Sequence, residues 1–170
     1  MSRTHGFPPV TRPDAKILIL GSMPSRESLA RQQYYAHPRN AFWPILCSLF
    51  SITATKYHER SQAVAERGVA IWDVLHDCVR PGSLDSDIDE KTAVTNDFQA
   101  FFNGHRQIAG VCFNGAKAES IYVKRVLPGL DDAAAKISRN RLPSTSPAHA
   151  GMNFEQKKAA WRSVLKAVLE

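Results

Sequence analysis

The stretch Ala15–Ser25, with the sequence AKILILGSMPS, sets the fold of this 170-residue chain. Within it, Ile17 to Leu20 form a short apolar run that Gly21 and Pro24 end. Such a run is typical of a buried strand that continues into a loop. The residues before it, through Pro13, are rich in proline and polar groups, and we expect residues 1–13 to form an N-terminal arm.

Further strands and helices follow this first strand in alternation. Strands are predicted over Val69–Leu75, Ile108–Gly115 and Lys136–Leu142, and helices over Phe42–Phe50, Lys56–Arg67, Asn96–Asn103, Ala116–Val126 and about Asn153–Leu169. The polar stretch HDCVRPGSLDSDID, residues 76–89, is expected to be a long loop. Alternating strands and helices favour a parallel sheet that is covered on both faces. We therefore expect an α/β fold, a three-layer α/β/α sandwich with a central parallel four-stranded sheet, in a single domain over residues 1–170.

Charge and cysteine content narrow the class of protein. The formal net charge of +6 suits a polyanionic partner such as DNA. None of the cysteines, Cys47, Cys78 and Cys112, lies in a CxxC pair, which argues against a zinc site or an iron–sulfur cluster. We expect no metal and no other cofactor. The odd cysteine count without a signal peptide indicates a cytoplasmic protein, expected to be a monomer, and no apolar stretch is long enough to span a bilayer.

In sheets of this kind, ligands bind beyond the carboxyl ends of the strands. That rule gathers four segments at one edge: GSMPS (Gly21–Ser25), the loop after Leu75, FNG (Phe113–Gly115) and STSPAHA (Ser144–Ala150). The segment YYAHPRN (Tyr34–Asn40) follows the first of these, and we expect it to cover the same edge.

Two residues of YYAHPRN are suited to hold a base. The Tyr35 ring can stack on a planar base, a contact worth about 1–3 kcal/mol. The Asn40 amide is both a donor and an acceptor, so it can hold a water or bind a base edge. Alternatively, Asn40 serves only as the N-cap of the helix over Phe42–Phe50.

The other loops at this edge offer polar groups. GSMPS has the character of a phosphate-holding turn, in which backbone N–H groups near Ser22 and Met23 are available to an anion. Asn114 either reads a base edge or belongs to an Asn-Gly turn. In the last loop, the hydroxyl residues and a histidine either bind DNA phosphates or form a polar turn before a helix. These residues are Ser144, Thr145, Ser146 and His149.

Several enzyme classes lack their motifs here. No GxSxG elbow supports a Ser-His-Asp hydrolase, and GSMPS does not have the GxGxxG spacing of a dinucleotide site. The P-loop pattern is also absent. The acidic run DSDIDE, Asp85–Glu90, reads as a solvated loop rather than as a metal site.

Taken in order, the segments resemble the uracil-DNA glycosylase superfamily from about Lys16 to the end of the chain. The run AHPRNAFW is similar to AHPxNxFW of the mismatch-specific uracil/thymine glycosylases. The resemblance is closest to the hypoxanthine (deoxyinosine) DNA glycosylase branch, which is similar in GSMPS, YYAHPRNAFW, WDVL…RPGSLDSDI, FNG and STSPAHA.

The resemblance implies a DNA glycosylase of base excision repair that acts on double-stranded DNA and leaves an abasic site. It implies that Asn40 is the catalytic amide and that Tyr35 stacks on the flipped base. Met23 stands where the mismatch-specific enzymes carry a catalytic Asn, and Ser144 stands where the main uracil-specific family has His. Both departures count against uracil and favour hypoxanthine. Two alternatives stay open: a uracil or mismatch-specific glycosylase, and a non-catalytic DNA- or nucleotide-binding domain.

Overall fold

A four-stranded parallel sheet forms the centre of the computed structural model, which describes the backbone of residues 2–169 and the side chains of residues 2–166. The two end residues of the expected domain, 1 and 170, lie outside this range. The strands are β2 (Ile17–Gly21), β3 (Val69–Asp73), β6 (Gly110–Asn114) and β7 (Ser138–Leu142), in the spatial order β3-β2-β6-β7. Every neighbouring pair is parallel, so the predicted central sheet is confirmed.

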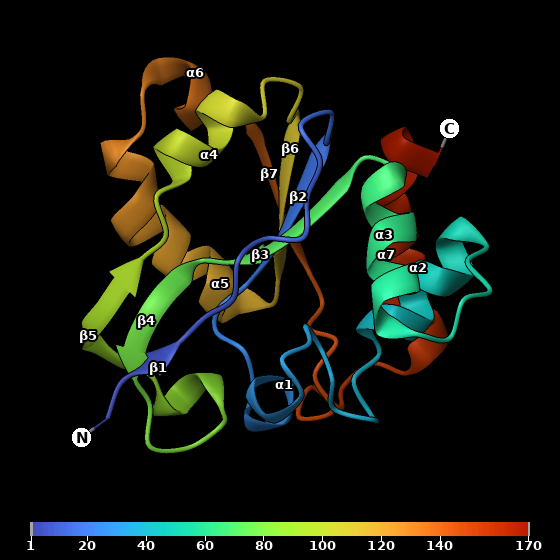
Figure 1. Cartoon of the computed structure of the whole chain (residues 1–170), viewed down its shortest axis with the longest axis horizontal. Coiled ribbons are helices and arrows are strands. Elements are labelled where there is room, and N and C mark those ends of the chain that lie inside the picture. Colours follow the sequence, from blue (N-terminus) through green and yellow to red (C-terminus); the bar gives the residue numbers. More distant parts are fainter. Residues whose placement is uncertain (1, 170) are drawn as a thin grey trace.

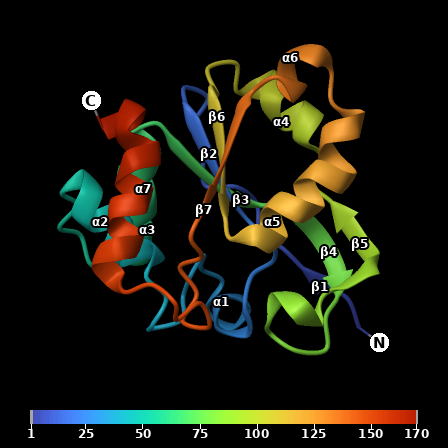
Figure 2. The same cartoon turned by 180° about the vertical axis from the view of Figure 1, so that it is seen from behind.

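Helices cover both faces of this sheet, as Figures 1 and 2 show from opposite sides. One face carries α2 (Phe42–Phe50), α3 (Tyr57–Glu66) and α7 (Phe154–Leu169); the other carries α4 (Phe98–Gly104), α5 (Ala116–Ile121) and α6 (Asp132–Ala135). Short 3₁₀ and π turns cover Asp85–Asp87, Leu127–Gly129 and Tyr122–Val126. The predicted three-layer α/β/α sandwich is therefore confirmed. None of the helices described combines the length and the apolar character that crossing a bilayer requires.

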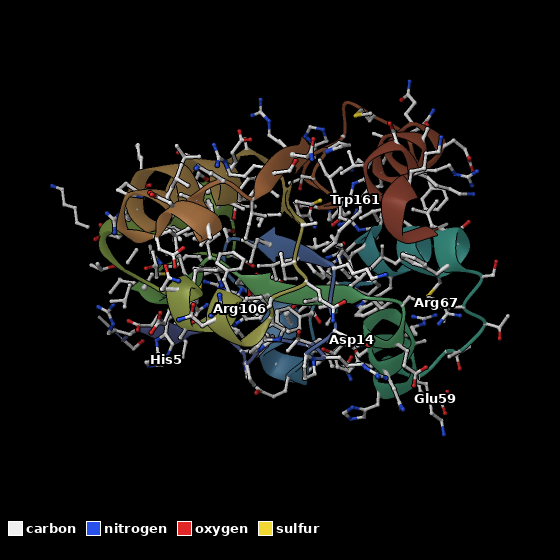
Figure 3. All side chains as sticks on the ribbon, turned by 90° about the horizontal axis from the view of Figure 1, so that it is seen from above. His5, Asp14, Glu59, Arg67, Arg106 and Trp161 are labelled. Atoms are coloured by element: carbon white, nitrogen blue, oxygen red, sulfur yellow. The ribbon has the colours of Figure 1, made fainter. Side chains whose placement is uncertain are left out.

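Burial explains why the strands lie where they do. All five residues of β2 and all five of β3 are buried, as expected for strands covered on both faces. Trp161 is fully buried, and it lies between α7 and the rest of the core, whereas His5 and Glu59 lie at the periphery (Figure 3). The Trp161 indole N–H donates to the Pro143 carbonyl at 3.0 Å, which ties α7 to the chain leaving β7.

A second, antiparallel sheet was not predicted. It contains β1 (Thr4–His5), β4 (Leu75–Val79) and β5 (Asp89–Thr95), in the order β1-β4-β5. The expectation of one long loop over residues 76–89 is therefore wrong. The polar sequence of β4 does not indicate a strand, because its inward position is taken by a carboxylate. Asp77 is 8% exposed and is paired with Arg3 and His76.

The expected N-terminal arm is packed against the rest of the chain over the part that the structure describes. β1 pairs with β4, and Val10 exchanges two backbone hydrogen bonds with Ile71, at 2.9 and 2.8 Å. Farther along the chain, the Tyr34 hydroxyl donates to the Pro8 carbonyl at 2.8 Å. The arm thus links the antiparallel sheet to the segment Tyr34–Asn40.

Candidate active site

The four parallel strands end level with one another. Gly21 is opposite Asp73, and Asn114 is opposite Leu142, so the loops that follow these residues leave the same edge. In Figures 1 and 2 this edge faces α1 (Arg26–Arg31) and the loop after β7. The sheet therefore brings together GSMPS, FNG and STSPAHA, as the strand-end rule predicts, whereas the fourth selected segment is not a loop but strand β4.

The segment Tyr34–Asn40 is anchored on this edge through Tyr34. The Tyr34 ring is buried, and its hydroxyl bonds the N-terminal chain. Its N–H donates to the Tyr57 hydroxyl at 3.1 Å, and its carbonyl accepts from the Trp43 indole at 2.8 Å. At the other end of the segment, the Ala41 N–H donates to the Thr145 carbonyl at 3.0 Å. The loop after β7 and the segment Tyr34–Asn40 are thereby held side by side.

Asn40 is half-buried at the start of α2. Its Oδ1 accepts from the Phe42 N–H at 2.9 Å, and its own N–H donates to the His37 carbonyl at 2.9 Å. The N-cap residue of α2 is Ala41, so the expectation that Asn40 occupies that position is wrong by one residue. Because a backbone N–H needs an acceptor, the Phe42 contact fixes which end of the amide is oxygen. The Asn40 amide therefore has one defined orientation.

Tyr35 lies beside Asn40 in a backbone conformation that side chains rarely adopt, with φ at +54°. Its ring stacks on Phe42, with the centroids 3.9 Å apart and the planes 20° apart. A cavity of about 400 Å³, a size that ligand pockets commonly have, is lined by Tyr35, Asn40, His37, Trp43, Tyr57 and Arg60 among others. The two central residues of the sequence-based prediction thus border one space.

The Tyr35 hydroxyl reaches from this ring to the ends of the strands. A Cβ atom on Gly21 would lie 2.9 Å from this hydroxyl and 2.6 Å from Oδ1 of Asp73, so only glycine fits there. The hydroxyl is buried and no hydrogen bond of ordinary distance and angle reaches it, although the Asn114 amide lies close enough to interact with it. Burial raises the pKa of Tyr35, Asp73 adds to the rise, and the Asn114 side chain opposes it. Tyr35 therefore stays protonated at neutral pH.

Asn114 and Thr145 bond each other through both ends of the Asn114 amide. Asn114 Nδ2 donates to the Thr145 hydroxyl at 2.9 Å, and Asn114 Oδ1 accepts from the Thr145 N–H at 2.9 Å. Thr145 is only 1% exposed, so the structure does not place its hydroxyl where a DNA phosphate could reach it. Gly115 makes the turn that follows, with φ at +97°. The structure thus shows Asn114 in the loop-shaping role, and the Asn114 amide also interacts with the Tyr35 hydroxyl.

Ser22 and Met23 lie under the edge rather than on its surface. Ser22 is 7% exposed and its hydroxyl donates to Asp85, while Met23 is 8% exposed. The sequence-based expectation concerned their backbone N–H groups, and the side chains are directed into the protein.

The rest of the loop after β7 is more exposed. The Ser144 hydroxyl accepts from the Ser146 N–H, and the Ser146 hydroxyl accepts from the Ala148 N–H, both at 3.2 Å. His149 is exposed, and its N–H donates to the Ser146 carbonyl at 3.0 Å. These bonds shape a turn that presents His149 to solvent.

Sequence reasoning missed Lys157 in this loop's surroundings. Its side chain is 5% exposed, and its ammonium group donates to the Ser146 carbonyl at 3.4 Å. Burial lowers the pKa of Lys157. No sequence signal marks it, because a lysine on a polar helix face is ordinarily solvated.

Sequence reasoning also missed Asp73, the last residue of β3, and the charged residues near it. Asp73 is 3% exposed, and its Oδ2 has no hydrogen-bond partner. Burial raises the pKa of Asp73 to about 7; Asp85 adds to this rise, and Arg80 opposes it. Arg80 is itself buried, and it donates to the Pro24 carbonyl at 2.5 Å. A carboxyl group at a strand end was visible in the sequence, but its burial depends on residues from other segments.

The fold and the site correspond to one class of protein. The model of the Uracil DNA glycosylase superfamily matches residues 8–169, and the chain belongs to this superfamily. It is an enzyme, a DNA glycosylase, and the predicted resemblance is confirmed.

Particular relatives are more specific. A protein named hypoxanthine DNA glycosylase from Methanosarcina acetivorans is 34% identical over 147 residues, which is 81% of this chain and 92% of the relative. Another of that name from Methanosarcina barkeri is 35% identical over 118 residues, 68% of this chain and 73% of the relative. The solution NMR structure of a Methanosarcina acetivorans protein, provisionally named a uracil DNA glycosylase, superposes with a TM-score of 0.80 at 29% identity, covering 99% of this chain and all of that one.

Proposed function

We propose that this DNA glycosylase removes hypoxanthine from deoxyinosine in double-stranded DNA, as a monofunctional enzyme of base excision repair. The relatives at 34% and 35% identity carry that activity in their names. The observation that carries the proposal is the placement of Asn40: its amide is oriented by Phe42 and borders the same cavity as the Tyr35 ring. Met23, in the first strand-end loop, offers neither an amide nor a carboxylate.

Asn40 positions the water that attacks C1′ of the deoxyribose. An amide oxygen has two acceptor sites, so Oδ1 can accept from a water while it also holds the Phe42 N–H. An amide is too weak a base to take the water's proton, so its contribution is orientation. The C1′–N9 bond breaks as the sugar gains oxocarbenium character. The water's hydroxyl group then joins C1′, and its proton leaves with the base.

Tyr35 and Asn114 hold the extruded base. The nucleotide must leave the duplex before its glycosidic bond can be reached, and a mispaired base leaves most easily. Hypoxanthine formed from adenine faces thymine and is mispaired in this sense. One face of the Tyr35 ring is covered by Phe42, so the base stacks on the other face. The free amide hydrogen of Asn114 donates to the edge of the base.

The departing purine carries developing negative charge, which donors at the strand ends can stabilise. In this proposal the backbone N–H groups near Ser22 and Met23, together with Asn114 Nδ2, supply these donors. DNA itself is held from the loop after β7, where His149 and the turn at Ser146 approach phosphates, and the chain's net charge of +6 favours the encounter.

Base specificity is tested with a panel of short duplexes, each containing deoxyinosine, deoxyuridine, deoxyxanthosine or a T·G mismatch. Abasic sites are cleaved with alkali, and strand scission is measured under single-turnover conditions. We expect the fastest scission with deoxyinosine, and no scission before alkali because no lysine lines the cavity beside Asn40 in the described part of the chain.

Two outcomes would contradict this proposal. Equal or faster scission at deoxyuridine would make the protein a uracil glycosylase, the name that the structural relative carries. Salt-sensitive DNA binding without scission of any duplex would leave a binding domain on a glycosylase scaffold.

A further inference from the structure

The ends of β3, β2 and β6 bring Asp73, Gly21 and Asn114 side by side, and polar side chains fill the place that a side chain on Gly21 would take. Gly21 ends the middle strand, with Asp73 on the neighbouring strand on one side and Asn114 at the end of the other neighbour. A Cβ on Gly21 would collide with both Asp73 Oδ1 and the Tyr35 hydroxyl. Two polar side chains therefore lie directly against the backbone of Gly21.

The polar side-chain atoms beside Gly21 are buried and incompletely paired. Asp73 Oδ2 and the Tyr35 hydroxyl have no hydrogen-bond partner, although buried polar atoms nearly always have one. The cost of burying a carboxyl group without partners is recovered only if something else supplies a donor. In this structure the Tyr35 hydroxyl stands next to that carboxyl group, so a base that stacks on the free face of the Tyr35 ring has its edge near Asp73.

The Asn114 side chain, at the end of β6 on the other side of Gly21, has a fixed orientation. The Thr145 N–H must face an acceptor, so Asn114 Oδ1 points to it and Nδ2 carries the remaining hydrogen. Asn114 therefore presents a donor, while Asp73 presents an acceptor. A ligand that satisfies both needs a carbonyl oxygen beside an N–H group.

We propose that Asp73 is a specificity-determining residue that accepts the N1–H of the flipped base while Asn114 donates to its O6, so that the pair selects hypoxanthine over intact adenine. This inference rests on the proposed function and adds a residue to it. Deamination of adenine turns N1 from an acceptor into a donor and replaces the 6-amino group by a carbonyl. An intact adenine would set the N1 lone pair against the Asp73 carboxylate and its amino group against the Asn114 donor, leaving both pairs mismatched.

The charge of Asp73 decides whether it can act in this way. Burial raises the pKa of Asp73 to about 7, and the titratable groups that interact with it are Asp85, Arg80, Tyr34 and Tyr35. Below this pKa the group is a carboxylic acid, which can donate to an intact base. Above it the group is a carboxylate and accepts only.

The test compares wild type with Asp73→Asn and with a matched control, Asp14→Asn. Asp14→Asn removes the same carboxyl group, but Asp14 is exposed and lies just before the start of β2, whereas the site lies at the end of that strand (Figure 3). Excision of deoxyinosine is measured from pH 5.5 to 8.5, and binding is measured for matched duplexes that contain deoxyinosine or deoxyadenosine. We expect wild-type excision to rise through about pH 7 as Asp73 ionises, and Asp14→Asn to behave in the same way.

For Asp73→Asn, we expect at least a tenfold smaller preference for deoxyinosine over deoxyadenosine, and loss of the pH-dependent rise. A wild-type preference and pH profile in the folded Asp73→Asn protein would overturn the inference. A purely structural role would lower the affinity for both duplexes equally, which would also overturn it. If wild type excised no deaminated base, the proposed function would fail, and the binding preference would still decide the role of Asp73.

Discussion

The folded protein buries the Asp73 carboxyl group in a place where its ionised form is disfavoured. It is almost fully buried, Oδ2 lacks a partner, and the nearby Arg80 gives it no direct hydrogen bond, although Arg80 Nε is also buried without a partner. Replacing such a group with a neutral one usually costs little stability. Functional sites are where proteins commonly keep groups of this kind.

The stability of the protein should therefore depend on pH through Asp73. Its pKa is raised from an ordinary value of 3.8 to about 7 in the folded state, so the folded chain binds the proton more tightly than the unfolded chain. This contribution to stability is present at low pH and is lost as pH rises from about 4 to about 7. At pH 8, Asp73→Asn should be more stable than wild type by up to about 4 kcal/mol, because each unit of pKa shift corresponds to about 1.4 kcal/mol.

Urea unfolding of both proteins between pH 4 and pH 8 measures this difference. The gap in unfolding free energy between variant and wild type should widen with pH. A gap that stays constant across that range would show that Asp73 does not titrate in the way its burial requires.

Residue-level chemistry was only partly predictable from the sequence. Tyr35 and Asn40 could be selected because an aromatic ring and an amide stood in a proline-broken loop near a strand end. The position of Asn40 relative to the helix was missed by one residue, since the Phe42 contact depends on local geometry. Asp73 was missed because its burial is created by Gly21 and Tyr35, which are distant in sequence.

At the level of elements, the N-terminal strand and the segment Tyr34–Asn40 support each other. Tyr34 is the link, because its hydroxyl bonds the Pro8 carbonyl while its backbone holds Tyr57 and Trp43. The position of Tyr35 and Asn40 over the strand ends therefore depends in part on residues at the start of the chain.

Tyr34→Phe should loosen this link while it leaves the ring packing intact. Loss of one hydroxyl hydrogen bond costs about 1 kcal/mol of unfolding free energy. Amide hydrogen exchange should become faster at Gly6 and Val10, whose N–H groups bond His76 and Ile71. Tyr122→Phe, a buried ring on the opposite face of the sheet, is the matched control and should leave these two amides unchanged. Unchanged exchange in Tyr34→Phe as well would mean that the arm is held independently of Tyr34.

The elements themselves show where pattern reading succeeds. β2 and β3 are continuous apolar runs, as central parallel strands require, and their prediction was correct to within two residues. β4 and β5 were missed because their pattern is polar: His76 is exposed, and Asp77 is buried only by virtue of its pairing with Arg3. In the sequence alone, a buried carboxylate such as Asp77 cannot be told from a loop residue, because its partner Arg3 is far away along the chain.

On the scale of the whole molecule, one sheet edge collects every residue to which we assign a role in holding the base. Gly21, Asp73 and Asn114 come from three strands, and Asn40 is joined to the fourth strand's loop through Ala41 and Thr145. The alternation of strands and helices was enough to predict this gathering, because parallel strands send their carboxyl ends to one side. The chain's net charge of +6 adds an electrostatic attraction to DNA that should weaken as salt is raised.

The central claim is that the Asn40 amide positions the water that removes hypoxanthine. The most direct measurement is single-turnover excision of deoxyinosine by wild type and by Asn40→Ser, with folding checked by thermal unfolding. Serine keeps an oxygen that can accept from the Phe42 N–H, so the start of α2 survives while the amide is lost. We predict a rate lower by about 10²–10³, the effect of removing one polar catalytic group, with DNA binding retained. A folded Asn40→Ser protein that excises at close to the wild-type rate would contradict the account.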